Sequence, residues 1–158
     1  MVAEPLMVEF RADRREPVVE RMAALAAGRS GWINLSPGLD VDVPPPARSP
    51  LAGVLSGRGP AVPLATWTPG DAKSAASAGI QHGRGPKAAD QLAEAGAPVP
   101  DGWRVVQDHA KRGLVLTPPA GTSAAELDAV LAWLLRATAA LCPLPTTGEW
   151  RAYCYEPR

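Results

Sequence analysis

Glycine and proline interrupt this sequence so often that most of its helices and strands must be short. The chain has 15 glycines and 18 prolines among 158 residues, which approaches but does not reach the roughly 25–30% typical of low-complexity chains. Many of them fall where a helix or strand is expected to begin, turn or end. Two concentrations remain, at about residues 37–50 and 79–86.

The apolar pattern between these interruptions predicts three helices. The first follows a D-x-x-E start signal at Asp13 and Glu16 and stops at Gly28. The second opens at a proline and runs over about residues 86–95. The third begins with the capping box Ser123-Ala-Ala-Glu126 and carries an apolar stripe formed by Leu127, Val130, Leu131, Leu134 and Leu135.

Seven apolar or alternating runs are expected to be strands, whereas residues 72–80 are expected to form a short helix or a loop. A glycine-rich turn at 57–60 predicts a hairpin between the third and fourth runs. The runs cover residues 6–11, 31–37, 51–56, 61–67, 102–108, 114–117 and 149–155. In the last run alternate residues should face the core (Trp150, Ala152 and Cys154) and the opposite side (Arg151, Tyr153 and Tyr155).

This order of elements predicts a single α+β domain over residues 1–158. We expect a largely antiparallel sheet of about five to seven strands, with three helices packed mainly on one face. A doubly wound α/β fold is disfavoured because three of the connections resemble hairpins. The proline-rich loop at about 37–50 is a lid, a contact surface or only a connector.

The charge balance excludes several classes of protein. The chain has 16 Lys and Arg and 16 Asp and Glu, so its formal net charge is zero, which argues against a strongly basic nucleic-acid binder and an acidic tail. No apolar run is long enough to cross a membrane. Because the first residues lack a secretory pattern, we expect a cytoplasmic protein with reduced thiols at Cys142 and Cys154.

The second glycine-rich concentration predicts a binding site for an anionic group. Gly83, Gly85 and their neighbours precede a helix, where free N–H groups favour negative charge, and Arg84 and Lys87 would add positive charge. We therefore expect a small binding or interaction protein that holds a phosphate-bearing or other anionic ligand there. A protein partner is the other class of ligand that we consider.

An enzyme is an alternative, although the sequence favours a protein without catalytic activity. His82 and His109 lie in polar loops and could act as general acid or base, with Asp108 beside the second histidine. Neighbouring residues on a strand point to opposite faces, so Asp108 is not expected to pair with His109 directly. No motif indicates a metal or another cofactor.

A further alternative is a subunit of a larger protein or nucleic-acid assembly. The contact would be the proline-rich loop or the outer face of the sheet, on which Arg151, Tyr153 and Tyr155 would form a strip. A large exposed apolar patch would favour this hypothesis.

Two resemblances add to this interpretation. Residues Gly83–Leu92 resemble a helix-hairpin-helix element, which implies a nucleic-acid phosphate as ligand, but Arg84 stands where that element has an apolar residue. The segments GIQHGRGPKAADQLAEAG, GWRVVQDHAKRGLVL, GWINLSP and RGPAVPLATW are similar to a small protein family of high-GC Gram-positive bacteria. That family has no assigned activity, so the resemblance implies a bacterial cytoplasmic protein and no particular site residue.

Overall fold

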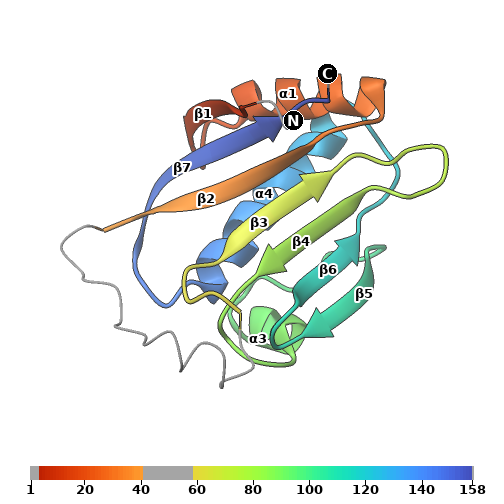
Figure 1. Cartoon of the computed structure of the whole chain (residues 1–158). Helices are drawn as coiled ribbons and strands as arrows, with labels where there is room; N and C mark the ends of the chain where they lie inside the picture. The colour runs from red at the N-terminus through yellow and green to blue at the C-terminus, as the bar shows by residue number, and fades with distance from the viewer. Residues whose placement is uncertain (1–3, 41–58, 158) are drawn as a thin grey trace.

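Within the residues that the structure describes, the fold is a seven-stranded antiparallel sheet with three helices on one face (Figure 1). The computed structural model describes residues 4–40 and 59–157. The strand order is β1-β7-β2-β3-β4-β6-β5. The strands are β1 (Leu6–Arg11), β2 (Trp32–Leu39), β3 (Leu64–Thr68), β4 (Ser77–Gln81), β5 (Arg104–His109), β6 (Gly113–Thr117) and β7 (Thr146–Tyr155), and the helices are α1 (Glu16–Gly28), α3 (Ala88–Glu94) and α4 (Ala124–Leu141).

The helices divide the inner face of the sheet between them. In Figure 1, α4 crosses behind the central strands, α1 lies along the β1 side and α3 lies behind the β5 side. The other face of the sheet is not covered by any helix in residues 4–40 and 59–157. The predicted α+β class is therefore confirmed, with every strand pairing antiparallel.

Helix α4 forms as its sequence predicts and supplies the centre of the core. The Ser123 hydroxyl accepts a hydrogen bond from the Glu126 backbone N–H at 3.2 Å, and all five residues of the expected apolar stripe are buried. Trp133 is also buried; its indole N–H donates to the Pro98 carbonyl at 2.9 Å, and its ring meets that of Trp103 edge-on at 5.0 Å. The aromatic rings therefore anchor the loop before β5 to α4.

Helix α1 spans the expected residues but does not use the expected cap. Its N-cap residue is Arg15, with no side-chain cap, and Asp13 accepts instead from Arg11 Nε at 3.3 Å. The D-x-x-E start signal is therefore wrong in detail. At the other end Gly28 is still helical, and the left-handed residue is Arg29, with a φ of 52°.

Strand β4 was not expected, because residues 72–80 were assigned to a short helix or a loop. Small residues dominate this stretch and hide its alternation, yet Ala78 and Ile80 are buried while Gly79 lies on the opposite face. Strand β4 is the hairpin partner of β3, and β2 lies on the other side of β3. The predicted pairing of residues 61–67 with 51–56 is therefore not the one that β3 makes, and residues 41–58, which include that run and most of the proline-rich loop, lie outside the described residues.

The second predicted helix begins later than expected, since α3 starts at Ala88 rather than at Pro86. Strand β7 alternates as predicted. Its buried residues are Trp150, Ala152 and Cys154, whereas Arg151, Tyr153 and Tyr155 lie on the open side.

Both cysteines are free thiols, and burial raises the pKa of Cys154. In the described ranges, no helix has the length and apolar character needed to cross a membrane.

Candidate functional site

The predicted anion-binding loop is closed by the protein's own hydrogen bonds. Residues 79–81 belong to β4, so the loop itself is limited to 82–87. The Gln91 side-chain amide donates to the carbonyls of Arg84 at 3.0 Å and Pro86 at 3.2 Å. These bonds fasten the loop to the start of α3, where Lys87 adopts a left-handed φ of 61°.

A carboxylate from β5 caps the first turn of α3. The backbone N–H groups of Ala88 and Ala89 donate to the two carboxylate oxygens of Asp108, at 2.9 and 3.0 Å. A helix start attracts an anion because its first N–H groups have no partner inside the helix. Asp108 supplies that negative charge from within the chain, so the geometry gives no support to a further anion at residues 83–87.

His82 is a buried residue with one satisfied ring nitrogen. Its side chain is 0% exposed, and its Nδ1 accepts from the Arg84 backbone N–H at 3.1 Å. Burial lowers the pKa of His82; the negative charge of Asp108 opposes this shift, and Arg84 adds to it. A neutral imidazole that accepts at Nδ1 carries its proton on Nε2, and this Nε2 has no hydrogen-bond partner in the described part of the chain.

His109 has a structural role in the hairpin of β5 and β6. Its Nδ1 accepts from the backbone N–H groups of Lys111 and Arg112, both at 3.1 Å, and so closes the turn between β5 and β6. As expected, Asp108 and His109 do not pair; the carboxylate turns toward α3 instead. Neither histidine lines either of the two hollows described next, and acid/base catalysis by them stays an untested prediction.

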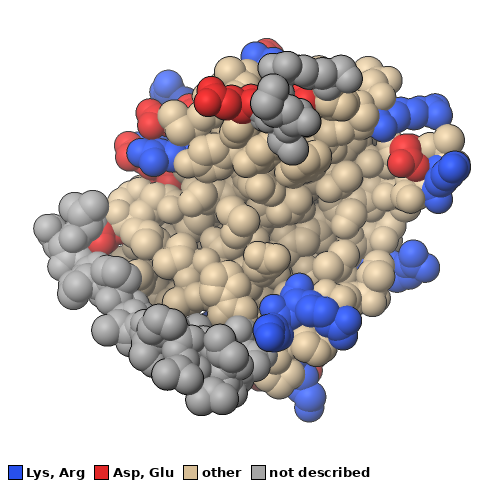
Figure 2. All heavy atoms as spheres, in the orientation of Figure 1, with Lys and Arg blue, Asp and Glu red and all other residues tan. Residues whose placement is uncertain are grey.

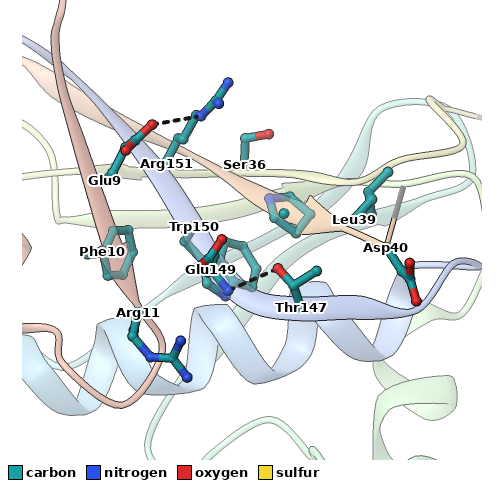
Figure 3. Close-up of a pocket in the computed structure, with 12 residues that line it drawn as sticks. Glu9, Phe10, Arg11, Ser36, Leu39, Asp40, Thr147, Glu149, Trp150 and Arg151 are labelled. Atoms are coloured by element: carbon teal, nitrogen blue, oxygen red, sulfur yellow. Dashed lines mark hydrogen bonds and ion pairs between the residues drawn. The ribbon is translucent and has the colours of Figure 1, made fainter. Parts of the chain in front are cut away.

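The larger hollow has a volume of about 770 Å³ and lies where β1 and β2 end and β7 begins (Figure 3). An irregular register between Pro37 and Leu39 opens it, and Gly38 is required there because a Cβ would lie 2.7 Å from the Glu149 carbonyl. Its lining mixes both signs of charge with apolar side chains: Glu9, Phe10, Arg11, Ser36, Pro37, Gly38, Leu39, Asp40, Thr147, Glu149, Trp150 and Arg151. Glu9 and Arg151 pair across it at 3.5 Å, so the hollow presents no single charge to a ligand.

The smaller hollow, of about 390 Å³, lies on the helix side between α4, β7 and the connection from β1 to α1. Arg15 on its wall is already engaged, since it donates to both carboxylate oxygens of Asp128 at 2.8 and 3.0 Å and to the Ala12 carbonyl at 2.7 Å. The hydrogen bonds from Arg15 lower the pKa of Asp128. Across residues 4–40 and 59–157, no three His, Cys, Asp or Glu side chains gather as metal ligands.

The open face of the sheet differs from an ordinary solvated face in its lack of charge. Register and alternation place no charged side chain on the open side of four consecutive strands, β2, β3, β4 and β6. Figure 2 shows this face as a broad uncharged area with charged side chains mainly around its margin. The side chains that the four strands turn outward are Trp32, Asn34, Ser36, Leu64, Thr66, Thr68, Ser77, Gln81, Val115 and Thr117.

An aromatic strip lies at the β1 side of this open face. It consists of Met7, Trp32, Tyr153 and Tyr155, which the register brings together as the pairs Met7–Tyr153 and Trp32–Tyr155. The rings of Trp32 and Tyr155 are stacked, with centroids 4.8 Å apart and planes 11° from parallel. The sequence placed Tyr153 and Tyr155 on this face but missed Trp32 and Met7, because only strand pairing brings them to the same place.

No family model, no curated protein and no solved structure matches this chain.

Proposed function

We propose that this protein binds a protein partner through the open face of its sheet, with the uncharged strands at the centre of the contact and the aromatic strip beside them. The observation that carries this proposal is the absence of charged side chains from the open side of four adjacent strands in the described residues. Charged residues are depleted in the cores of protein interfaces, where Tyr, Trp and Met are enriched.

The composition of the face indicates the chemistry of that partner. Tyr and Trp offer large contact areas at low conformational entropy, while Ser, Thr and Asn offer adaptable hydrogen bonds. The Thr66 hydroxyl donates to the Asn34 side-chain oxygen at 2.8 Å, which orients the Asn34 amide group. We therefore expect a partner surface that is uncharged at its centre and offers both hydrogen-bonding groups and an apolar side chain for the aromatic strip.

The area of the face is close to that of a stable contact. Seven strands spaced about 4.8 Å apart, each contributing about five residues of about 3.3 Å, cover about 550 Å² as a flat rectangle. The relief of the side chains adds to this figure. A standard interface buries about 800 Å² on each partner, so this face supplies most of the area that such a contact needs.

The test introduces one charge at the centre of the face. Tagged wild type, Thr66→Lys and Ala24→Lys would be used to capture bound proteins from cells that express the chain naturally, followed by quantitative mass spectrometry. Ala24 is exposed on α1, on the helix side, so Ala24→Lys adds the same charge away from the face. Circular dichroism would verify that all three proteins are folded.

We expect a partner that wild type and Ala24→Lys recover equally and that Thr66→Lys recovers about tenfold less, as for a residue at the centre of an interface. Titration of the purified pair would then give the same ratio. Equal recovery by Thr66→Lys, equal loss by Ala24→Lys, or no specific partner for wild type would overturn the proposal.

A further inference from the structure

Strand β1 is an edge of the sheet with an unused side. It pairs with β7 only, and in an antiparallel pair alternate backbone groups point away from the partner strand. Within the described ranges, residues 6–10 make no backbone hydrogen bond other than those of the β1–β7 ladder. Arg11 differs, because its carbonyl accepts from the Arg14 N–H at 2.9 Å.

The apolar side chains at this edge are exposed on both faces of the strand. Leu6 is 44% exposed and Met7 is 48% exposed, and because they are adjacent they point to opposite sides. Proteins usually protect such an edge with charged side chains, proline or a bulge. From Leu6 to Phe10 the strand has no proline, its register with β7 is continuous, and its one charged side chain, Glu9, is paired with Arg151.

The opposite edge of the sheet is protected in the usual way. Strand β5 has an irregular register between Val105 and Gln107. The intervening Val106 is 57% exposed and lies outside the regular ladder. The two edges therefore carry comparable apolar exposure, but only β1 offers an unbroken ladder to another strand.

We infer that β1 pairs antiparallel with β1 of a second copy of this chain. A two-fold interface requires a surface that complements itself, and residues 6–10 meet this condition because their one charged side chain, Glu9, can face Met7 of the second copy rather than the other Glu9. Glu9 also pairs with Arg151 of its own chain at 3.5 Å, so the joint carries no unpaired charge from either Glu9.

The exposed residues select one register, centred on Val8. In that register Val8 lies opposite Val8 of the second copy, and Met7 lies opposite Glu9. Leu6 meets Phe10 of the second copy on the helix side. A register centred on Phe10 would pair Glu9 with Arg11 but would leave Leu6 and Met7 uncovered. Pairing about Val8 covers both side chains and uses only residues that make no backbone hydrogen bond beyond the β1–β7 ladder.

This dimer would have a direct consequence for the open face. The two-fold axis is perpendicular to the joined sheet, so the helices of both copies lie on one side and both open faces lie on the other. Met7 belongs to the aromatic strip, and the strips of the two copies therefore meet at the joint. The joined surface would present two equivalent contact sites to a partner.

The first test measures mass in solution. Size-exclusion chromatography with light scattering over a concentration series should give wild-type protein a mass that approaches twice the 16.5 kDa of the chain. Met7→Lys should give the single mass, because a charge at an edge blocks strand addition. Val106→Lys is the matched control at the opposite edge and should keep the doubled mass. A single mass for wild type at every concentration, or loss of the dimer in Val106→Lys but not in Met7→Lys, would overturn the inference.

The second test fixes the register. Residues directly opposite in an antiparallel pair have Cβ atoms about 4.5–5.5 Å apart, within reach of a disulfide after small shifts. Val8→Cys should therefore form a disulfide-linked dimer on mild oxidation, whereas wild type, with Cys142 and Cys154, and Val106→Cys should not. No cross-link in Val8→Cys under conditions where the protein is dimeric would refute pairing about Val8.

Discussion

The carboxylate cap on α3 gives the sharpest quantitative prediction. Asp108→Ala removes both acceptors from the N–H groups of Ala88 and Ala89, which are 2.9 and 3.0 Å from its oxygens. Replacing an N-cap residue by alanine costs about 0.5–2 kcal/mol, and a hydrogen bond to a charged group contributes about 1.5–3 kcal/mol. Because one carboxylate makes both bonds here, we expect Asp108→Ala to lower the free energy of unfolding by about 2 kcal/mol.

Urea unfolding followed by tryptophan fluorescence would measure this loss, and a thermal scan should show a decrease in Tm of about 4–8 °C for a chain of this size. Asp101→Ala is the matched control, because Asp101 is exposed and its side chain makes no hydrogen bond or ion pair with residues 4–40 or 59–157. Asp108→Asn keeps one acceptor oxygen and should lose about half as much. If Asp108→Ala and Asp101→Ala changed stability equally, the cap would not contribute as argued.

Two further predictions concern the same region. The folded pKa of His82 is lowered by burial, so as pH falls the unfolded chain takes up its proton first, near its ordinary pKa of about 6.5. Stability should therefore fall from about pH 7 downward until folded His82 also protonates, and His82→Asn, which keeps an acceptor for Arg84, should flatten the denaturation profile in that window. Inorganic phosphate should leave the Tm of the wild type unchanged, because Asp108 already satisfies the start of α3; a shift that Lys87→Ala abolishes would restore the predicted anion site.

The sequence was sufficient where one segment decides its own structure. The capping box at Ser123 and the stripe from Leu127 to Leu135 fix both the start and the buried face of α4. In β7 the alternation around Trp150 fixes which side chains face the core. These elements carry large apolar residues at regular spacing, and their local preference agrees with their place in the fold.

Local patterns failed where the deciding contact lies far along the chain. Strand β4 has few large side chains, and only its pairing with β3 and β6, which come from other parts of the chain, marks it as a strand. Likewise, Asp108 lies 20 residues from Ala88, so its role as a cap could not be predicted from the sequence near α3. The sequence of the glycine-rich loop predicts a ligand site because Asp108, whose carboxylate caps α3, lies outside that stretch.

The neutral composition of the chain hides a separation of charge that only the fold reveals. Equal numbers of acidic and basic residues suggest a surface of mixed charge. Strand alternation instead keeps charge off the open side of β2, β3, β4 and β6, while Glu9 and Arg11 lie at the β1 edge and Arg104 at the β5 edge. Because an uncharged surface repels few partners and attracts few by long-range steering, recognition there must depend on close packing and hydrogen bonding. The stacked rings of Trp32 and Tyr155 and the oriented amide of Asn34 are the groups on this face best suited to that kind of contact.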